Sequence, residues 1–159
     1  KKMNLNESNG VVLSPDIGSA PMSQSYAKKL GIGFALIDKR RTGHNQAEVA
    51  NLIGELEGRH AIIIDDMIDT AGTICNAAHS AMDNGAINVT CVATHPILSG
   101  PAIERLTKAP IEKVIVCDTL VVSEEKKFDK LEIISVAKVF GESIGRIDSG
   151  HSLSSMFHF

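Results

Sequence analysis

Residues 65–73 gather three carboxylates, two threonine hydroxyls and one glycine directly after the most apolar run of the chain. Two adjacent carboxylates, here Asp65 and Asp66, are costly together unless a cation or sugar hydroxyls meet them. A helix predicted to begin at Gly72 would offer backbone N–H groups and the positive end of its dipole, which suit a phosphate. The stretch therefore predicts a site for a sugar and its phosphate. The alternative is a solvated turn in which a threonine caps the helix.

Two further segments carry groups that could take part in chemistry. Lys39 and Arg41 are cationic donors that could neutralise charge on a transferring phosphoryl group. The alternative for them is a solvated basic loop. His95 follows a predicted strand and precedes a proline, where it would act either as a structural hydrogen-bonding group or as a base.

The elements that must position these residues alternate between strands and helices. Continuous apolar runs such as residues 61–64 are typical of strands covered on both faces of a parallel sheet. We predict strands at 11–13, 34–37, 61–64, 89–94, 114–117 and 133–134, and helices at 20–30, 72–83, 101–108 and 136–147. The alternation predicts an α/β fold with three layers and a mostly parallel sheet. Residues 38–46 have no apolar face, so we expect a loop there.

Composition limits the class of protein. The 159 residues suit one domain, residues 1–159, whose polar ends at 1–9 and 150–159 we expect to be flexible. A net charge of −3 excludes a nucleic-acid binder driven by bulk positive charge. No apolar run approaches the roughly 18–20 residues that span a bilayer, so we expect no membrane contact. Three widely spaced cysteines in apolar surroundings are typical of reduced thiols in a cytoplasmic protein.

The 65–73 stretch resembles the ribose-phosphate-binding signature of the phosphoribosyltransferase superfamily. Other short motifs occur in order along the chain: Ser14-Pro15-Asp16, Asp38-Lys39-Arg40-Arg41, Thr94-His95-Pro96, Ser99-Gly100-Pro101-Ala102 and Ser152-Leu153-Ser154. Together they resemble the C-terminal domain of the two-domain ribose-phosphate diphosphokinase family. The resemblance implies a phosphoribosyltransferase-like fold. It also implies transfer of the diphosphoryl group of ATP to ribose 5-phosphate, which makes phosphoribosyl diphosphate for nucleotide biosynthesis.

The resemblance also implies a role for individual residues. Ribose 5-phosphate would be bound by Asp65, Asp66, Asp69, Thr70, Ala71, Gly72 and Thr73. Lys39 and Arg41 would be the catalytic pair on a mobile loop. Asp16, Gly18 and Ser19 would form the diphosphate loop, with Asp16 helping to place Mg²⁺. Ser152, Ser154 and Phe157 would line a regulatory site between subunits. The partners would be ATP, ribose 5-phosphate and further copies of the chain, as dimers that build a hexamer. Without the N-terminal half of the family, the chain would not turn over ATP.

Two alternatives stay open. A phosphoribosyltransferase would need a hood that recognises a base, and residues 99–102 and the tail do not resemble one. The other alternative is a non-catalytic regulatory or associated subunit of the same fold. It is favoured by Gly18-Ser19, where the family usually has two glycines, and by residues 21–25, where an arginine-bearing stretch usually follows. Lys39, Arg41 and the 65–73 stretch oppose it.

Overall fold

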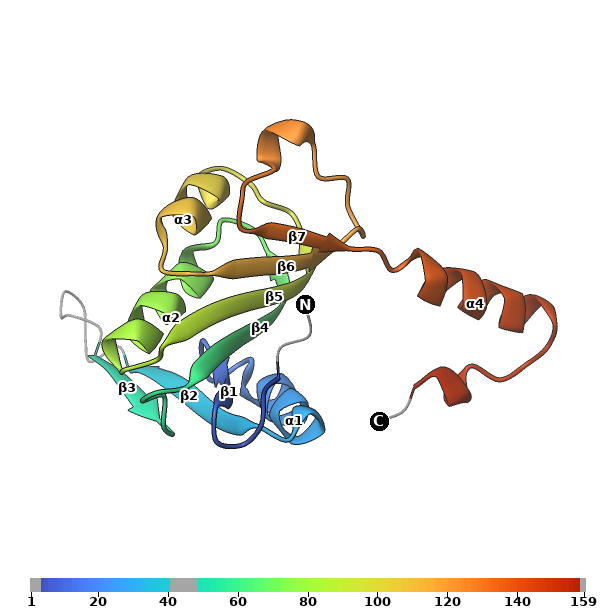
Figure 1. Cartoon of the computed structure of the whole chain (residues 1–159). Helices are drawn as coiled ribbons and strands as arrows, with labels where there is room; N and C mark the ends of the chain where they lie inside the picture. Colours follow the sequence, from blue (N-terminus) through green and yellow to red (C-terminus); the bar gives the residue numbers. More distant parts are fainter. Residues whose placement is uncertain (1–3, 41–48, 158–159) are drawn as a thin grey trace.

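A seven-stranded sheet forms the centre of the computed structural model, which describes residues 4–40 and 49–157 (Figure 1). The strands lie in the order β3-β2-β1-β4-β5-β6-β7. Neighbouring strands are parallel except β2 and β3, which are antiparallel. The strands are β1 (Gly10–Ser14), β2 (Gly33–Arg40), β3 (Val49–Ile53), β4 (His60–Ile68), β5 (Asn88–Pro96), β6 (Lys113–Cys117) and β7 (Leu131–Ile134). The helices are α1 (Ala20–Leu30), α2 (Gly72–Asp83), α3 (Ala102–Lys108) and α4 (Ala137–Asp148), with short 3₁₀ turns η1 (Glu124–Lys126) and η2 (Ser154–Met156).

Helices cover both faces of the sheet, with α1 on one face and α2 and α3 on the other (Figure 1). Strand β1 shows the consequence, because Val11 and Leu13 join the core beneath α2 and α3 while Val12 joins the core beneath α1. Successive side chains of a strand point to opposite faces, so a strand buried on both faces is apolar at every position. The predicted three-layer α/β fold with a mostly parallel sheet is confirmed.

The strand order changes direction next to β1, which lies between β2 and β4. From β1 the chain moves outward to β2 and β3, and it then continues on the other side of β1 with β4. In open α/β sheets, ligands bind outside the carboxyl ends of the strands where the order reverses. Here that place lies between the turn after Ser14 and the turn after Ile68.

The structure corrects the predicted loop at 38–46. Strand β2 continues through residues 38–40. It pairs there with β3, a strand that we did not predict. Lys39 pairs with Ala50 in this antiparallel ladder. The partner strand satisfies the backbone hydrogen bonds whatever the side chains are, so a polar sequence can extend an edge strand. Residues 41–48, including the predicted catalytic Arg41, lie outside the described residues.

The structure also shortens the loop predicted after residue 64. Asp65 to Ile68 continue β4 and pair with the end of β5, so that Asp65 lies opposite Ala93 and Ile68 opposite Pro96. Only residues 69–71 connect β4 to α2. The carboxylate of Asp65 is therefore held on a strand rather than on a loop.

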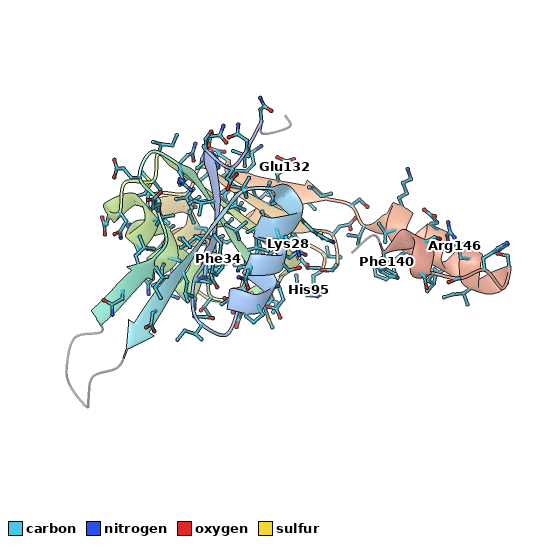
Figure 2. All side chains as sticks on the ribbon, turned by 90° about the horizontal axis from the view of Figure 1, so that it is seen from below. Lys28, Phe34, His95, Glu132, Phe140 and Arg146 are labelled. Atoms are coloured by element: carbon cyan, nitrogen blue, oxygen red, sulfur yellow. The ribbon has the colours of Figure 1, made fainter. Side chains whose placement is uncertain are left out.

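Helix α4 projects from the sheet at the far end of β7, and residues 151–157 fold back along it (Figures 1 and 2). None of residues 137–148 is buried against the described part of the chain. Phe140 and Ile144 are 60% and 65% exposed. The helix predicted at 136–147 is confirmed, whereas the flexibility expected of the two ends stays a prediction. Within the described ranges, no helix combines the length and the apolar character needed to cross a membrane.

Candidate functional site

The stretch from the end of β4 into α2, residues 65–74, lines a cavity of about 150 Å³ with every residue except Asp66. We call this stretch the β4–α2 junction. Its lining includes six of the seven residues predicted for the sugar phosphate, namely Asp65, Asp69, Thr70, Ala71, Gly72 and Thr73. Asp66 is the seventh, and its side chain is exposed next to Asp65. The cavity lies at the carboxyl end of β4, beside the reversal of strand order.

The start of α2 is built to leave backbone donors available. The first N–H···O bond of the helix joins Cys75 to the carbonyl of Ala71 over 3.0 Å, so the amides of Gly72, Thr73 and Ile74 precede the helical ladder. No side chain caps this start, and its first turn carries no acidic residue. The positive end of the helix dipole thus faces the cavity with no negative side chain of the helix to offset it.

Ala71 takes a left-handed backbone conformation, with φ of +61°. An L-residue other than glycine adopts this conformation only at an energetic cost, so the surrounding structure must hold it there. A left-handed residue next to helical ones also aims successive N–H groups at one point, which makes a concave site for an anion. The geometry of Ala71 therefore suits a phosphate bound by backbone amides.

Three carboxylates influence one another here, those of Asp65 and Asp66 in the last part of β4 and that of Asp16 just after β1. Burial raises the pKa of Asp65 above its ordinary value, and the nearby carboxylates of Asp66 and Asp16 add to the rise. The amide of Asp66 donates a 2.9 Å hydrogen bond to Oδ1 of Asp65, which opposes the rise only in part. A ligand that brings hydroxyl donors or positive charge would relieve this repulsion.

Asp16 is held by the turn that follows β1. Its Oδ1 accepts hydrogen bonds from the amide and the hydroxyl of Ser19, over 2.9 and 3.0 Å. Ser14, the last residue of β1, donates through its hydroxyl to the carbonyl of Asp16 over 2.8 Å. A side chain at Gly18 would come within 3.3 Å of Asp16 Oδ1. The structure thus brings the three predicted diphosphate-loop residues together around one carboxylate oxygen.

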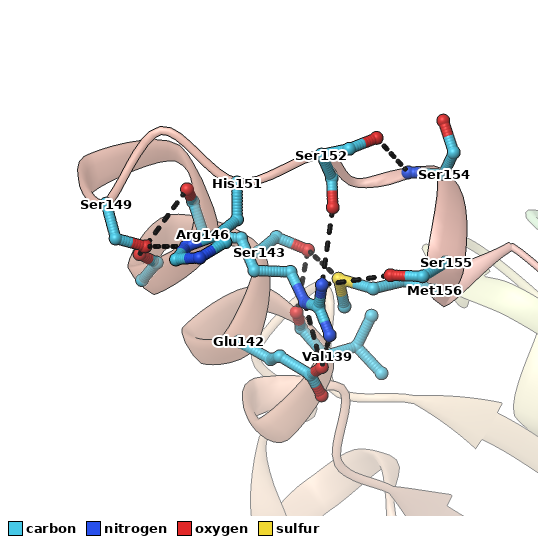
Figure 3. A network of polar contacts seen from close by, with 11 residues as sticks. Val139, Glu142, Ser143, Arg146, Ser149, His151, Ser152, Ser154, Ser155 and Met156 are labelled. Carbon is cyan, nitrogen blue, oxygen red and sulfur yellow. Dashed lines mark hydrogen bonds and ion pairs between the residues drawn. The ribbon is translucent and has the colours of Figure 1, made fainter.

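None of the other predicted residues that the structure describes is among those that line this cavity, although His95 pairs in the β4–β5 ladder with Met67, which does. Lys39 belongs to β2, and Arg41 lies outside the described residues. His95 Nδ1 lies 2.9 Å from Thr119 Oγ1, a contact that fits the structural reading of this histidine. Ser152 and Ser154 belong to the segment that folds back along α4. There Arg146 donates to the Ser152 carbonyl over 3.3 Å (Figure 3).

Two residues at the site were missed by reasoning from the sequence. The Ser99 hydroxyl donates to Oδ1 of Asp69, and Arg105 Nη1 donates to the carbonyl of Thr70 over 3.0 Å. Ser99 comes from the turn between β5 and α3, and Arg105 from α3 itself, about thirty residues farther along the chain. The Ser99-Gly100-Pro101-Ala102 motif was noted in the sequence, but no spacing rule connects it with residues 69 and 70.

Comparison with known proteins points to one family. Residues 41–158 match the family model described as "Phosphoribosyl synthetase-associated domain". The ribose-phosphate pyrophosphokinase of Aquifex aeolicus is 52% identical over 149 residues, which are 94% of this chain and 48% of that protein. The chain spans about half the length of the curated relatives that it matches.

Solved structures show the same likeness. The phosphoribosylpyrophosphate synthetase of Mycobacterium smegmatis superposes with a TM-score of 0.83 and 35% identity, over 89% of this chain and 46% of that chain. The orotate phosphoribosyltransferase of Aeropyrum pernix reaches a TM-score of 0.51 at 18% identity, over 86% of this chain and 66% of that one. The second likeness shows a shared fold alone, of the phosphoribosyltransferase type that the sequence predicts.

Proposed function

The chain belongs to the family of phosphoribosyl synthetase-associated domains, and on that premise we propose that it is the ribose 5-phosphate-binding half of a ribose-phosphate diphosphokinase. The observation that carries the proposal is the cavity at the β4–α2 junction, with a carboxylate at the strand end and an uncapped helix start. In this proposal Asp65 and Asp66 face the sugar hydroxyls. Residues 69–73 surround the 5-phosphate, which the amides of the helix start bind.

The proposed reaction of the whole enzyme is a diphosphoryl transfer. The anomeric hydroxyl oxygen of ribose 5-phosphate bonds to the β-phosphorus of ATP, the bond from that phosphorus to the AMP oxygen breaks, and the hydroxyl loses its proton. Such a transfer depends on positioning and on cations near the phosphoryl oxygens. This chain holds the acceptor sugar, and Lys39 and Arg41 are proposed to neutralise charge on the transferring group.

The residues around Asp16 fit a hydrated Mg²⁺. Among the described residues, no group of three or more His, Cys, Asp or Glu is placed to hold a metal ion. Mg²⁺ usually keeps several waters and takes only one or two protein carboxylates, so Asp16 with Asp65 nearby is sufficient. A bound Mg²⁺ would supply positive charge to the phosphate oxygens. Asp16 would hold the ion, and Ser19 would orient Asp16.

One observation favours the non-catalytic subunit as a second candidate. Ser19 already occupies Oδ1 of Asp16 with two hydrogen bonds, and the family's second glycine is the residue it replaces. Under this reading the chain would bind ribose 5-phosphate but not support transfer. Replacement of Ser19 by glycine in a reconstituted enzyme separates the two candidates. A catalytic chain supports turnover with Ser19 in place, whereas under the second reading turnover appears only with Ser19→Gly.

Titration calorimetry of the purified chain tests the binding proposal. Ribose 5-phosphate should bind, inorganic phosphate should bind more weakly, and free ribose should bind far more weakly. Thr73→Ala should weaken binding of the phosphorylated sugar by roughly fivefold, which is about one lost hydrogen bond. Thr107→Ala, on α3 and bonded to its own helix, is the matched control. Equal affinity for ribose and ribose 5-phosphate would contradict the proposal.

The proposal also concerns what the chain does with ATP. Because it spans about half the length of its relatives, we propose that it releases no AMP from ATP and ribose 5-phosphate until the other half is added. We further propose that the protein is cytoplasmic, in keeping with cysteines 75, 91 and 117, which are free thiols. We also propose that it forms a homo-oligomer. AMP formation by the chain alone would refute the first of these statements.

A further inference from the structure

One segment contacts three consecutive carbonyl groups of the β4–α2 junction. The amide of Leu98 donates to the carbonyl of Ile68 over 2.9 Å, and the amide of Ser99 donates to that of Asp69 over 3.1 Å. Arg105 Nη1 donates to the next carbonyl, that of Thr70, over 3.0 Å. We call residues 98–105 the bracing segment. It reaches the junction from the turn after β5 and from α3.

These contacts determine which way the backbone donors of the junction point. In a trans peptide the N–H of one residue points opposite to the carbonyl of the residue before it. The carbonyls of residues 68–70 point toward the bracing segment. The amides of Asp69, Thr70 and Ala71 therefore point away from it. These three residues also line the cavity, so an amide turned from the bracing segment is available to a ligand bound there.

Arg105 acts beside a residue in a left-handed backbone conformation. Its hydrogen bond fixes the peptide plane between Thr70 and Ala71, and Ala71 is the residue with φ of +61°. Its Nη1 would lie only 3.4 Å from a Cβ at Gly72, so the guanidinium lies against the first residue of α2. Arg105 thus contacts the backbone on both sides of Ala71, at the Thr70 carbonyl and at Gly72.

Ser99 fixes the same turn from its other end. Its amide holds the Asp69 carbonyl, and its hydroxyl holds Oδ1 of the same residue. The Asp69 carboxylate is therefore directed to the bracing segment. An acidic side chain beside a phosphate would repel it, and the bond to Ser99 gives this carboxylate a place away from that charge.

We propose that Arg105 and Ser99 are positioning residues that hold the junction backbone in the conformation that binds the phosphate of the sugar. The inference rests on the proposed function, since it names the groups that prepare the same site. Neither residue touches the ligand in this proposal. Both act through the peptide groups of residues 69–71.

Variants on α3 test the inference with a matched control. Arg105→Ala should weaken binding of ribose 5-phosphate and of inorganic phosphate by about fivefold to tenfold, as loss of one hydrogen bond from a charged donor does. Lys108→Ala removes the same charge from the same helix, where Lys108 pairs with Glu104. It should leave both affinities within about twofold. Arg105→Lys, which keeps the charge and one donor, should restore part of the loss.

The readouts separate positioning from mere stability or bulk charge. Binding is measured well below the melting temperature of each variant, so a purely stabilising role would leave the dissociation constants unchanged. A bulk-charge effect would vanish at high salt and would appear equally in Lys108→Ala. In NMR spectra, added phosphate should shift the amides of residues 69–71 in the wild-type chain and shift them less in Arg105→Ala and Ser99→Ala.

Failure of this inference is distinguishable from failure of the proposed function. If the wild-type chain binds ribose 5-phosphate and Arg105→Ala binds it equally well, the inference is overturned and the function stands. If the wild-type chain binds no ribose 5-phosphate, the function fails. The contact between the bracing segment and the junction is then tested without ligand, by amide hydrogen exchange of Leu98 and Ser99. Faster exchange in Arg105→Ala would support the role of Arg105 in holding the junction backbone. Unchanged exchange would overturn it.

Discussion

The Nε2 atom of His60 lies 2.9 Å from the Oγ1 atom of Thr90, across the boundary between β4 and β5. Thr90 is buried, and its neighbours in the ladder are core residues of both strands. Burial lowers the pKa of His60 from its ordinary value, and the charge of Glu112 opposes this only in part. His60 is the first residue of β4, so protonation of its ring affects the start of this central strand.

The free energy of unfolding should fall when the solution becomes acidic. Because the folded state holds the pKa of His60 below about 6.5, the unfolded chain takes up this proton first. The contribution of His60 is complete above about pH 6.5 and is lost as the pH falls through the lower folded-state pKa. Denaturant unfolding at a series of pH values measures it. His60→Gln should reduce this pH dependence. His79→Gln, at an exposed histidine, is the control. An identical pH profile for His60→Gln and the wild-type chain would contradict the prediction.

Ser23→Ala should stabilise the chain. Ser23 is completely buried on α1, and within the described residues its hydroxyl has no hydrogen-bond partner. A buried hydroxyl without a partner costs about 1–3 kcal/mol, so its removal should raise the free energy of unfolding by about 1 kcal/mol. Urea unfolding monitored by circular dichroism checks this. Ser143→Ala, whose hydroxyl donates to the carbonyl of Val139, should bring no gain. A loss of stability in Ser23→Ala would show that the hydroxyl has a partner.

Gly54→Ala should destabilise the chain strongly, and Gly58→Ala only mildly. Both glycines have positive φ, +104° and +68°. A Cβ at Gly54 would lie 2.7 Å from the carbonyl oxygen of Phe34, whereas one at Gly58 meets nothing within 4 Å. Gly58→Ala should cost about 1 kcal/mol from backbone strain, and Gly54→Ala about 3 kcal/mol because β2 must also shift. Thermal melts of the two variants give the comparison. Equal costs would mean that strain alone accounts for both.

Ala71→Gly should preserve binding of ribose 5-phosphate, and Ala71→Val should abolish most of it. Glycine takes the left-handed conformation of residue 71 without cost, so stability should rise by up to about 1 kcal/mol. A β-branched residue is a pronounced outlier there, so valine should force the turn into another conformation. Calorimetry with ribose 5-phosphate measures both. If valine bound the ligand as well as alanine does, the backbone cradle would not be the phosphate site.

Much of the architecture was predictable because burial on both faces leaves a local signature. The apolar run at 61–64 predicted β4, and the helix at 72–83 was predicted with the bounds that α2 has. The end of β2 and all of β3 were not predicted. The end of β2 is polar at Asp38 and Lys39, so its pairing depends on the backbone of a partner rather than on an apolar pattern. β3 is apolar at four of its five positions, but nothing local in its sequence names the strand with which it pairs.

The candidate site was predictable only in its local part. Residues 65 and 69–73 surround one cavity because they are close in sequence and a strand end meets a helix start there. The contacts of Ser99 and Arg105 with the same turn depend on how α3 packs beside α2. The resemblance implied that Asp69 belongs to the stretch around the 5-phosphate, and in the structure the Ser99 hydroxyl donates a hydrogen bond to its side chain. Local pattern therefore predicts which residues form a site, and packing decides which of them have side chains left for a ligand.

Because α4 projects from the sheet, we expect it to unfold separately from the sheet and the helices that cover it. A helix of about twelve residues is marginal in water by itself, and none of residues 137–148 is buried against the described part of the chain. Its internal support comes from Arg146, which bonds Glu142 within the helix and Ser155 in the segment that folds back. Unfolding of α4 therefore removes almost no packing contacts from the sheet. We expect the global free energy of unfolding to report on the sheet and the helices that cover it, while α4 frays separately and exchanges its amides first.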